Sequence, residues 1–484
     1  MKRLKWLGLS GVICGAMLFG CRAEETFPDL GSKVASPADI AQSKDGSVFY
    51  ALNADFDRTY NAGSILVVDQ DGKKLRAVGA PRLGRFLVTA GDDMLVGFDS
   101  ADEESKEAIY LYDISTPSKP VLKKVWDDIG CSPLNAVIRN GYDHFAVSCI
   151  FGDLFVGTLA ADRSKSTLKK VREYKYSRRA MFLDPHRELL MGFTTILGAQ
   201  SLDDSEEYDR ETWNDEIQKV KVDGEDVGNE VPDEFENSRA DQRKLGRQYR
   251  YQFFIYDIAA ERSSGFKLKE VTEDAVKNEL RWMYFKVTNF DGTPDPGTSQ
   301  SADVNYYRTN FWAARPDPTD INSFYLSHRG PPTNTGSPHA NHIIKVTMKG
   351  DVKVNAETGK KPKTRDVFLF ERVYGFNGEQ NSKFKYPGDF QVSLVGGKKL
   401  LVVNHFRDLV HWDRDDVYYS LVAQSLDGSL WIGETETNTD PELSWFQFEM
   451  NSEGRGIAAS YYGNRLLRFD LTPGVGFSNI TTVK

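Results

Sequence analysis

A two-strand unit recurs seven times along the chain, and it constrains the fold more than any other feature of the sequence. Each copy ends with a segment of strand-forming residues that leads into a turn rich in Asp, Gly, Ser or Pro. These segments cover residues 64–73, 108–119, 154–165, 251–263, 342–351, 419–428 and 465–474. Three of the six spacings between their turns lie near 45 residues. Four short strands in about 40 to 50 residues are typical of one β-propeller blade.

Another short apolar segment lies before each of these segments and is the first of the two strands in the unit. The seven copies cover residues 47–53, 93–99, 144–150, 188–194, 323–328, 399–405 and 456–462. The sequence therefore predicts an all-β protein in which residues 37–484 form one seven-bladed propeller. Six or eight blades, or a pair of β-sandwiches, are the alternatives. Either residues 27–36 or residues 475–483 would complete the last blade and close the ring.

Two of the turn regions carry a recognisable motif. The first unit begins Pro37-Ala-Asp-Ile-Ala-x-Ser-x-Asp-Gly, and the second contains Tyr112-Asp-Ile-Ser-Thr-Pro-Ser-Lys-Pro. This pattern resembles the YVTN, LVIVD and NHL-like propellers, over nearly all of residues 37–475. The resemblance implies a fold and not an activity, because such propellers have many functions.

The N-terminus has the three zones of a secretory signal peptide, residues 1–20. A basic start precedes an apolar run over residues 6–19. That run would be about 21 Å long as a helix, too short for a bilayer core of about 30 Å. The stretch Leu18-Phe19-Gly20-Cys21 resembles the lipobox of bacterial lipoproteins. The resemblance implies cleavage before Cys21, a lipid on its thiol, and a tether to the membrane through the linker 21–36. An ordinary signal peptide that happens to precede a cysteine is the alternative.

The residue after that cysteine bears on location. Position 22 is Arg and not Asp, which under the sorting rule of Gram-negative bacteria implies the outer membrane of the cell envelope.

The chain's negative charge is concentrated in one insertion, residues 200–248. Within it, residues 201–241 contain sixteen Asp or Glu and four Lys or Arg, a net charge of 4 − 16 = −12, whereas the whole chain has a net charge of −9. No basic face is evident, so nucleic acid is not an expected partner. Most long insertions, namely 200–248, 272–306, 328–341 and 406–417, fall in links that a propeller places on one face. We therefore expect that face to be the binding surface, and the opposite face, which carries 348–365, to be passive.

Five of the seven histidines lie in two of these insertions or beside them. The predicted binding residues are His328, Arg329, His339, His342, His405, Arg407, Asp408 and His411. Imidazoles in such numbers could hold Zn²⁺, but no metal-binding motif accompanies them. The sequence therefore predicts a polar pocket without a metal or another cofactor, with ordinary surface or packing histidines as the alternative.

Two cysteines remain besides Cys21 and the signal-peptide Cys14. Cys131 and Cys149 flank a turn at residues 140–142 and lie close to opposite each other in the hairpin that this turn predicts. Because an extracytoplasmic compartment is oxidising, we predict a disulfide between them.

The combined pattern favours a lipid-anchored propeller that binds a protein, peptide or glycan of the cell envelope without catalysis. A metal-dependent hydrolase or lactonase is the alternative, and it would need carboxylates from several blades at the central channel. Asp55, Asp57 and Asp99, at the ends of predicted second strands, permit such a site. The matched positions in three other blades are Phe151, Thr194 and Tyr462, which do not complete a carboxylate set.

Overall fold

The structure of the chain is a computed structural model. The residues that it describes are 27–100, 106–150, 153–172, 180–196, 221–222, 225–226, 250–267, 310–329, 342–350, 368–375, 387–405, 420–426, 431–435, 445 and 447–483.

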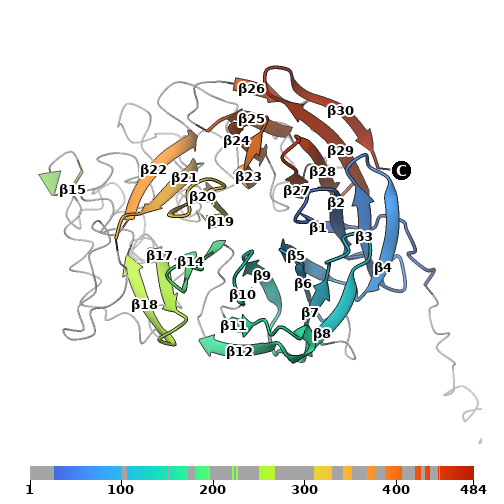
Figure 1. The fold of residues 1–484 in the computed structure, drawn as a ribbon, viewed down its shortest axis with the longest axis horizontal. Coiled ribbons are helices and arrows are strands. Elements are labelled where there is room, and N and C mark those ends of the chain that lie inside the picture. Colours follow the sequence, from blue (N-terminus) through green and yellow to red (C-terminus); the bar gives the residue numbers. More distant parts are fainter. Residues whose placement is uncertain are drawn as a thin grey trace, which may run out of the picture.

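Seven four-stranded antiparallel sheets follow one another around a central axis and form a β-propeller (Figure 1). Blade 1 consists of β1 (Pro37–Gln42), β2 (Val48–Asn53), β3 (Gly63–Asp69) and β4 (Lys74–Ala80). Blade 2 consists of β5 (Gly84–Ala90), β6 (Asp93–Phe98), β7 (Ala108–Asp113) and β8 (Val121–Asp127). Blade 3 consists of β9 (Pro133–Ile138), β10 (His144–Cys149), β11 (Leu154–Thr158) and β12 (Thr167–Arg172). Blade 4 consists of β13 (Ala180–Asp184), β14 (Leu189–Ile196), β17 (Arg250–Asp257) and β18 (Arg262–Lys267). Blade 5 consists of β19 (Asn310–Pro316), β20 (Ser323–Arg329), β21 (His342–Met348) and β22 (Phe368–Gly375). Blade 6 consists of β23 (Pro387–Val395), β24 (Lys398–His405), β25 (Ser420–Ser425) and β26 (Trp431–Glu434). Blade 7 consists of β27 (Gln447–Met450), β28 (Arg455–Ser460), β29 (Arg465–Thr472) and β30 (Gly476–Thr482). The prediction of an all-β protein with seven blades is confirmed.

Three short elements lie outside this pattern. β15 (Lys221–Val222) and β16 (Glu225–Asp226) pair within the acidic insertion, and η1 (Arg163–Lys165) is a single 3₁₀ turn between β11 and β12. Among the residues described, no helix is long and apolar enough to cross a membrane.

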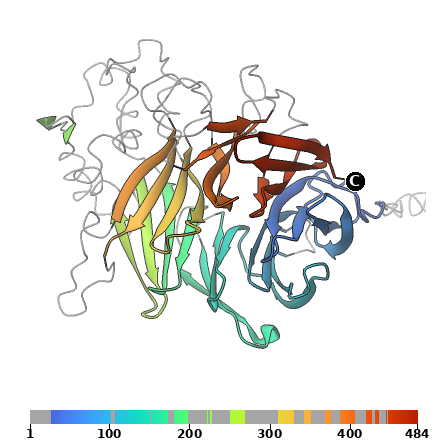
Figure 2. The same ribbon diagram turned by 45° about the horizontal axis from the view of Figure 1, so that its top comes forward.

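The second strand of a blade is the most buried, because neighbouring blades cover both of its faces. In β2, all six residues of the segment VFYALN are buried. The outer strand β8, by contrast, has exposed residues along most of its length. The tilted view shows the sheets packed face to face around the ring, each twisted along its strands (Figure 2).

Apolar side chains between adjacent blades form the core. One cluster joins blades 1 and 2 and contains Tyr50, Leu52, Met94 and Phe98. Similar clusters lie between blades 2 and 3, 3 and 4, 5 and 6, and 6 and 7. The core is thus divided into interfaces between sheets.

The ring closes without exchange of a strand between blades. β30 pairs with β29 and completes blade 7 from the C-terminal residues, which selects one of the two alternatives that the sequence left open. Blades 7 and 1 then pack through an apolar cluster that includes Phe49, Leu66, Ile457 and Val483. The Asn451 side chain donates a hydrogen bond across this junction to the Gly46 carbonyl at 2.9 Å.

Candidate functional site

A cavity of about 620 Å³ lies at the centre of the ring and is lined by residues from the first strand of every blade. Its volume is within the usual range for ligand sites, roughly 300 to 1,000 Å³. The lining continues to the turns between first and second strands, including Ser43–Gly46, Gly91, Asn140 and Ser452. These turns lie on the face opposite the links that carry most of the long insertions. Which of the two faces binds a ligand stays a prediction.

Four charged residues from four first strands meet in the cavity. Asp39 lies on β1, Arg315 on β19, Asp389 on β23 and Glu449 on β27. Because the first strands surround the axis (Figure 1), residues far apart in sequence are brought together there. These four residues therefore bring three carboxyl groups and one guanidinium from blades 1, 5, 6 and 7 into the cavity.

Arg315 and Asp389 form an ion pair between blades 5 and 6. The Nη2 atom of Arg315 lies 2.6 and 2.8 Å from the two carboxylate oxygens of Asp389, and its Nε donates to the Phe390 carbonyl at 3.1 Å. The Asp389 side chain is 4% exposed and that of Arg315 is 33% exposed. The guanidinium thus neutralises a buried carboxylate while part of it remains accessible from the channel.

Glu449 is held between two glutamines of the adjacent blades. Its Oε2 accepts hydrogen bonds from Gln42 Nε2 at 3.3 Å and Gln391 Nε2 at 3.1 Å. Both amides also donate to the Met450 carbonyl. Among the residues described, the other oxygen of Glu449, Oε1, has no hydrogen-bond partner. The glutamines therefore fix the carboxyl group and leave one acceptor for a ligand.

Asp39 links blade 1 to blade 2. Its Oδ2 accepts from the Leu87 backbone N–H at 2.7 Å, and its Oδ1 accepts from the N–H of Ile40 at 2.9 Å. Desolvation raises the pKa of Asp39 to about 7, an effect strengthened by the charge of Asp389 and opposed by the Leu87 hydrogen bond and Arg315.

The same buried environment changes the pKa of Glu449, which, like Asp39, forms no ion pair with a Lys or Arg among the described residues. Desolvation, with smaller effects of Asp389 and Asp39, raises the pKa of Glu449 to about 8, although the positive charge of Arg315 opposes the rise. We therefore expect Asp39 and Glu449 to titrate near neutral pH. Carboxyl groups with such shifted pKa values are common in functional sites.

Sequence reasoning missed this cluster, although a weak signal was present. The motif Pro-x-Asp/Asn begins three of the first strands, at 37–39 in β1, 133–135 in β9 and 387–389 in β23. In each copy, the Asp or Asn Oδ1 accepts the N–H of the following residue, and the pairing with the second strand shifts at this point. Aligning the first strands would have placed Asp39 and Asp389 at matched positions facing the axis.

The predicted histidine site is only partly described. The backbone of β20 pairs with β21 so that His328 lies opposite His342, with Arg329 next in β20, and His405 ends β24 in the neighbouring blade. These strand ends share the face that carries most of the insertions. His339, Arg407, Asp408 and His411 lie outside the described residues. The predicted pocket therefore stays a prediction.

Of the three carboxylates considered for a hydrolase, two form ion pairs and the third is exposed. Asp55 is 1% exposed and accepts from Arg82 Nε at 3.2 Å, Asp99 pairs with Arg85, and Asp57 is exposed. In the described part of the chain, no three His, Cys, Asp or Glu side chains form a group that could hold a metal ion. The carboxylates that do converge lie on first strands, whereas Asp55, Asp57 and Asp99 follow second strands.

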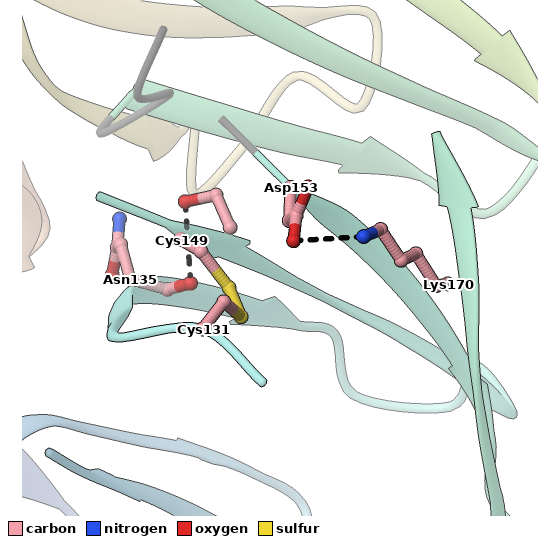
Figure 3. The surroundings of a disulfide bond; sticks show 6 residues. Cys131, Asn135, Cys149, Asp153 and Lys170 are labelled. Atoms are coloured by element: carbon pink, nitrogen blue, oxygen red, sulfur yellow. Dashed lines mark hydrogen bonds and ion pairs between the residues drawn. A yellow bond between two sulfur atoms is a disulfide. The ribbon is translucent and has the colours of Figure 1, made fainter. Parts of the chain in front are cut away.

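Cys131 and Cys149 are joined by a disulfide in the structure, with their Cα atoms 5.9 Å apart (Figure 3). Cys149 ends β10, whereas Cys131 precedes β9, and a register shift next to Cys149 places it opposite Pro133. The bond therefore crosses the end of the hairpin diagonally. Its formation in the cell stays a prediction.

The remaining sequence predictions lie mostly outside the described residues. These are the signal peptide, Cys21 and nearly all of the acidic insertion 200–248.

Comparisons with known proteins give structural neighbours but no sequence relative. No family model matches the sequence, and a search of curated proteins gives no match. Among solved structures, hydrazine synthase of Kuenenia stuttgartiensis is 10% identical, with a TM-score of 0.48 over 93% of this chain and 98% of that one. The Cps50 (Swd1) β-propeller domain of Myceliophteria thermophila is 9% identical, with a TM-score of 0.46 over 94% and 99%. Sqt1 of Chaetomium thermophilum, bound to the N-terminus of ribosomal protein L10, is 11% identical, with a TM-score of 0.40 over 92% and 96%. These likenesses bear on neither the ligand nor the activity of this chain.

Proposed function

We propose that this chain is a lipid-anchored protein of the bacterial cell envelope, attached to the outer membrane, that binds a protein, peptide or glycan without transforming it. The observation that carries the binding role is the central cavity, into which Gln42, Arg315, Gln391 and Glu449 place polar groups. These groups are fixed by hydrogen bonds between blades, so little ordering is required when a ligand binds. A segment of a larger ligand would enter from the turns between first and second strands.

A cavity-blocking substitution tests this role. Ala314 lies on β19, lines the cavity and is partly exposed, so Ala314→Trp would place an indole in the ligand's space. We expect tagged full-length protein to retain a component from solubilised envelopes, and Ala314→Trp to lose it. Ala259→Trp is the matched control, because Ala259 is exposed in the turn between β17 and β18. Equal retention by both variants would exclude the cavity as the binding site.

The lipid anchor has a separate test. Globomycin, which inhibits the lipoprotein signal peptidase, should cause the unprocessed form to accumulate. Cys21→Ser should remove the lipid and release the protein from the membrane fraction. Cys14→Ser, within the apolar run, is the control and should behave as the wild type. Normal processing and membrane retention of Cys21→Ser would contradict the anchor.

A hydrolase is the second candidate, and one observation favours it. Asp39 and Glu449 share the cavity and have raised pKa values, as acid–base catalysts often do. Each is nevertheless fixed by hydrogen bonds from other blades. The described residues also provide no metal-ligand group for the metal-dependent form of this alternative. We therefore place binding first.

A further inference from the structure

The described lining of the cavity contains more acidic than basic side chains. Its central cluster contains the carboxyl groups of Asp39, Asp389 and Glu449 against the single guanidinium of Arg315. Arg315 is paired with Asp389. Among the described residues, no Lys or Arg forms an ion pair with Asp39 or Glu449. Two carboxyl groups therefore lack a cationic partner in the part of the chain that the structure describes.

The other charged groups around the cavity do not supply one. They are Arg85 on β5, which pairs with Asp99, and Lys44 and Asp45, which are exposed in the turn after β1. The described lining from β9 and β13 adds Asn135 and Met181, which carry no charge. Among the described residues, no other charged side chain is part of the cavity lining.

The cavity also has unused hydrogen-bond acceptors. Glu449 Oε1 and Gln42 Oε1 have no hydrogen-bond partner among the described residues, and each Asp39 oxygen accepts one hydrogen bond while carrying two lone pairs. The amide nitrogen of Gln42 bonds to Glu449, which holds these two side chains next to each other. A ligand that donates several hydrogen bonds would satisfy these acceptors.

We propose that the central cavity recognises its ligand through a protonated basic group, an amine or a guanidinium, held by Asp39 and Glu449. This inference rests on the proposed function, which makes the cavity the binding site. A guanidinium offers five N–H donors in a planar fork and remains charged at all accessible pH values. The Arg315–Asp389 ion pair lines the same cavity and has no net charge, because the Asp389 carboxylate offsets the guanidinium.

Binding should release protons and become tighter as pH rises. The pKa values of Asp39 and Glu449, raised to about 7 and about 8, leave both groups largely neutral below those values. A cation prefers the ionised carboxylates, so its affinity increases as they lose their protons. Between about pH 6 and pH 8.5, a group with a pKa near 7 goes from about one-tenth ionised to almost fully ionised, which gives at least about a tenfold gain in affinity.

Calorimetric titration of the purified full-length protein with agmatine tests the proposal, with n-butylurea as an uncharged probe of similar shape. We expect agmatine to bind at least about tenfold more tightly at the higher pH, with proton release, and n-butylurea to bind only weakly at both. Asp39→Asn/Glu449→Gln should lose at least about tenfold in affinity together with the pH dependence. Glu261→Gln, which changes an exposed carboxylate outside the cavity, is the control. The single variant Glu449→Gln and a thermal melt of each protein establish that any loss occurs in folded protein.

Unchanged agmatine binding in folded Asp39→Asn/Glu449→Gln, or equal binding of n-butylurea, would overturn the proposal. Failure of the cavity as a binding site can be distinguished from failure of the cationic subsite within it. If the wild type retains an envelope component that Ala314→Trp loses, but agmatine does not bind, the cavity is a binding site and the cationic subsite is wrong. If Ala314→Trp retains the component as well, the binding role of the cavity fails independently.

Discussion

Replacing Gly157 by alanine is expected to lower the free energy of unfolding by about 3 kcal/mol, the upper part of the range for an overpacked core. Gly157 lies on β11 directly opposite Phe145 on β10, and a Cβ atom there would lie 2.0 Å from Phe145 Cζ. The Phe145 ring is fully buried and packed between blades 2 and 3, so it has little room to move. The midpoint of chemical denaturation should fall accordingly.

The control for this substitution is Gly79→Ala. Gly79 lies on β4, no atom lies within 4 Å of the position that its Cβ would occupy, and its φ is not positive. We expect its free energy of unfolding to stay within about 0.5 kcal/mol of the wild type or to rise slightly, because alanine restricts the unfolded chain. Equal destabilisation by the two substitutions would show that backbone freedom, and not the aromatic ring, determines the effect.

The contact between Gly157 and Phe145 is one of a recurring kind. Gly97 lies opposite Phe86 in blade 2, and Gly456 lies opposite Phe469 in blade 7; an added Cβ would lie 2.2 Å from the ring in both. In each pair, the aromatic ring packs against the backbone of the glycine and occupies the space that a side chain would need. Such pairs also help to fix strand register.

The second and third strands could be predicted from sequence because their environment is uniform. Both faces of β2 and β29 pack against other blades or strands, so the segments VFYALN and RLLRFD read as apolar strands followed by turns. Glycine and aspartate in those turns added a second, independent signal. These features together gave the correct number of blades.

The first strands did not show such a pattern, and the candidate site was missed with them. The strand β1 reads PADIAQ and β27 reads QFEM, because channel-facing positions carry Asp39, Gln42 and Glu449 among buried apolar residues. A polar residue in a short segment is ordinarily interpreted as part of a loop. Moreover, Gln42 and Glu449 are 407 positions apart in the chain, and only closure of the ring brings them together. No local pattern contains that information.

Removing Arg315 is expected to have the second large effect. Asp389 is 4% exposed, and Arg315 is the residue that neutralises it. Arg315→Met would leave a buried carboxylate without its counter-charge, which costs about 3 kcal/mol, the lower end of the range for fully buried pairs because Arg315 itself is partly exposed. Denaturant unfolding near neutral pH measures this loss. The exposed pair Lys169–Glu261 provides the control, since Lys169→Met removes a solvent-screened ion pair and should lower stability much less than Arg315→Met.

The pH dependence of that loss separates charge from packing. Without Arg315, no guanidinium offsets the cost of burying the ionised Asp389 carboxylate, so burial favours the protonated form of this group. A carboxyl group with a raised folded-state pKa destabilises the protein above its unfolded pKa and ceases to do so as pH falls below it. The deficit of Arg315→Met should therefore shrink from about pH 7 to about pH 4, and Arg315→Met/Asp389→Asn should recover at least half of it at neutral pH. A deficit that is constant with pH and is not recovered in the double variant would mean that Arg315 stabilises the ring through the packing of its side chain, and that the charge balance inferred for the cavity is incorrect.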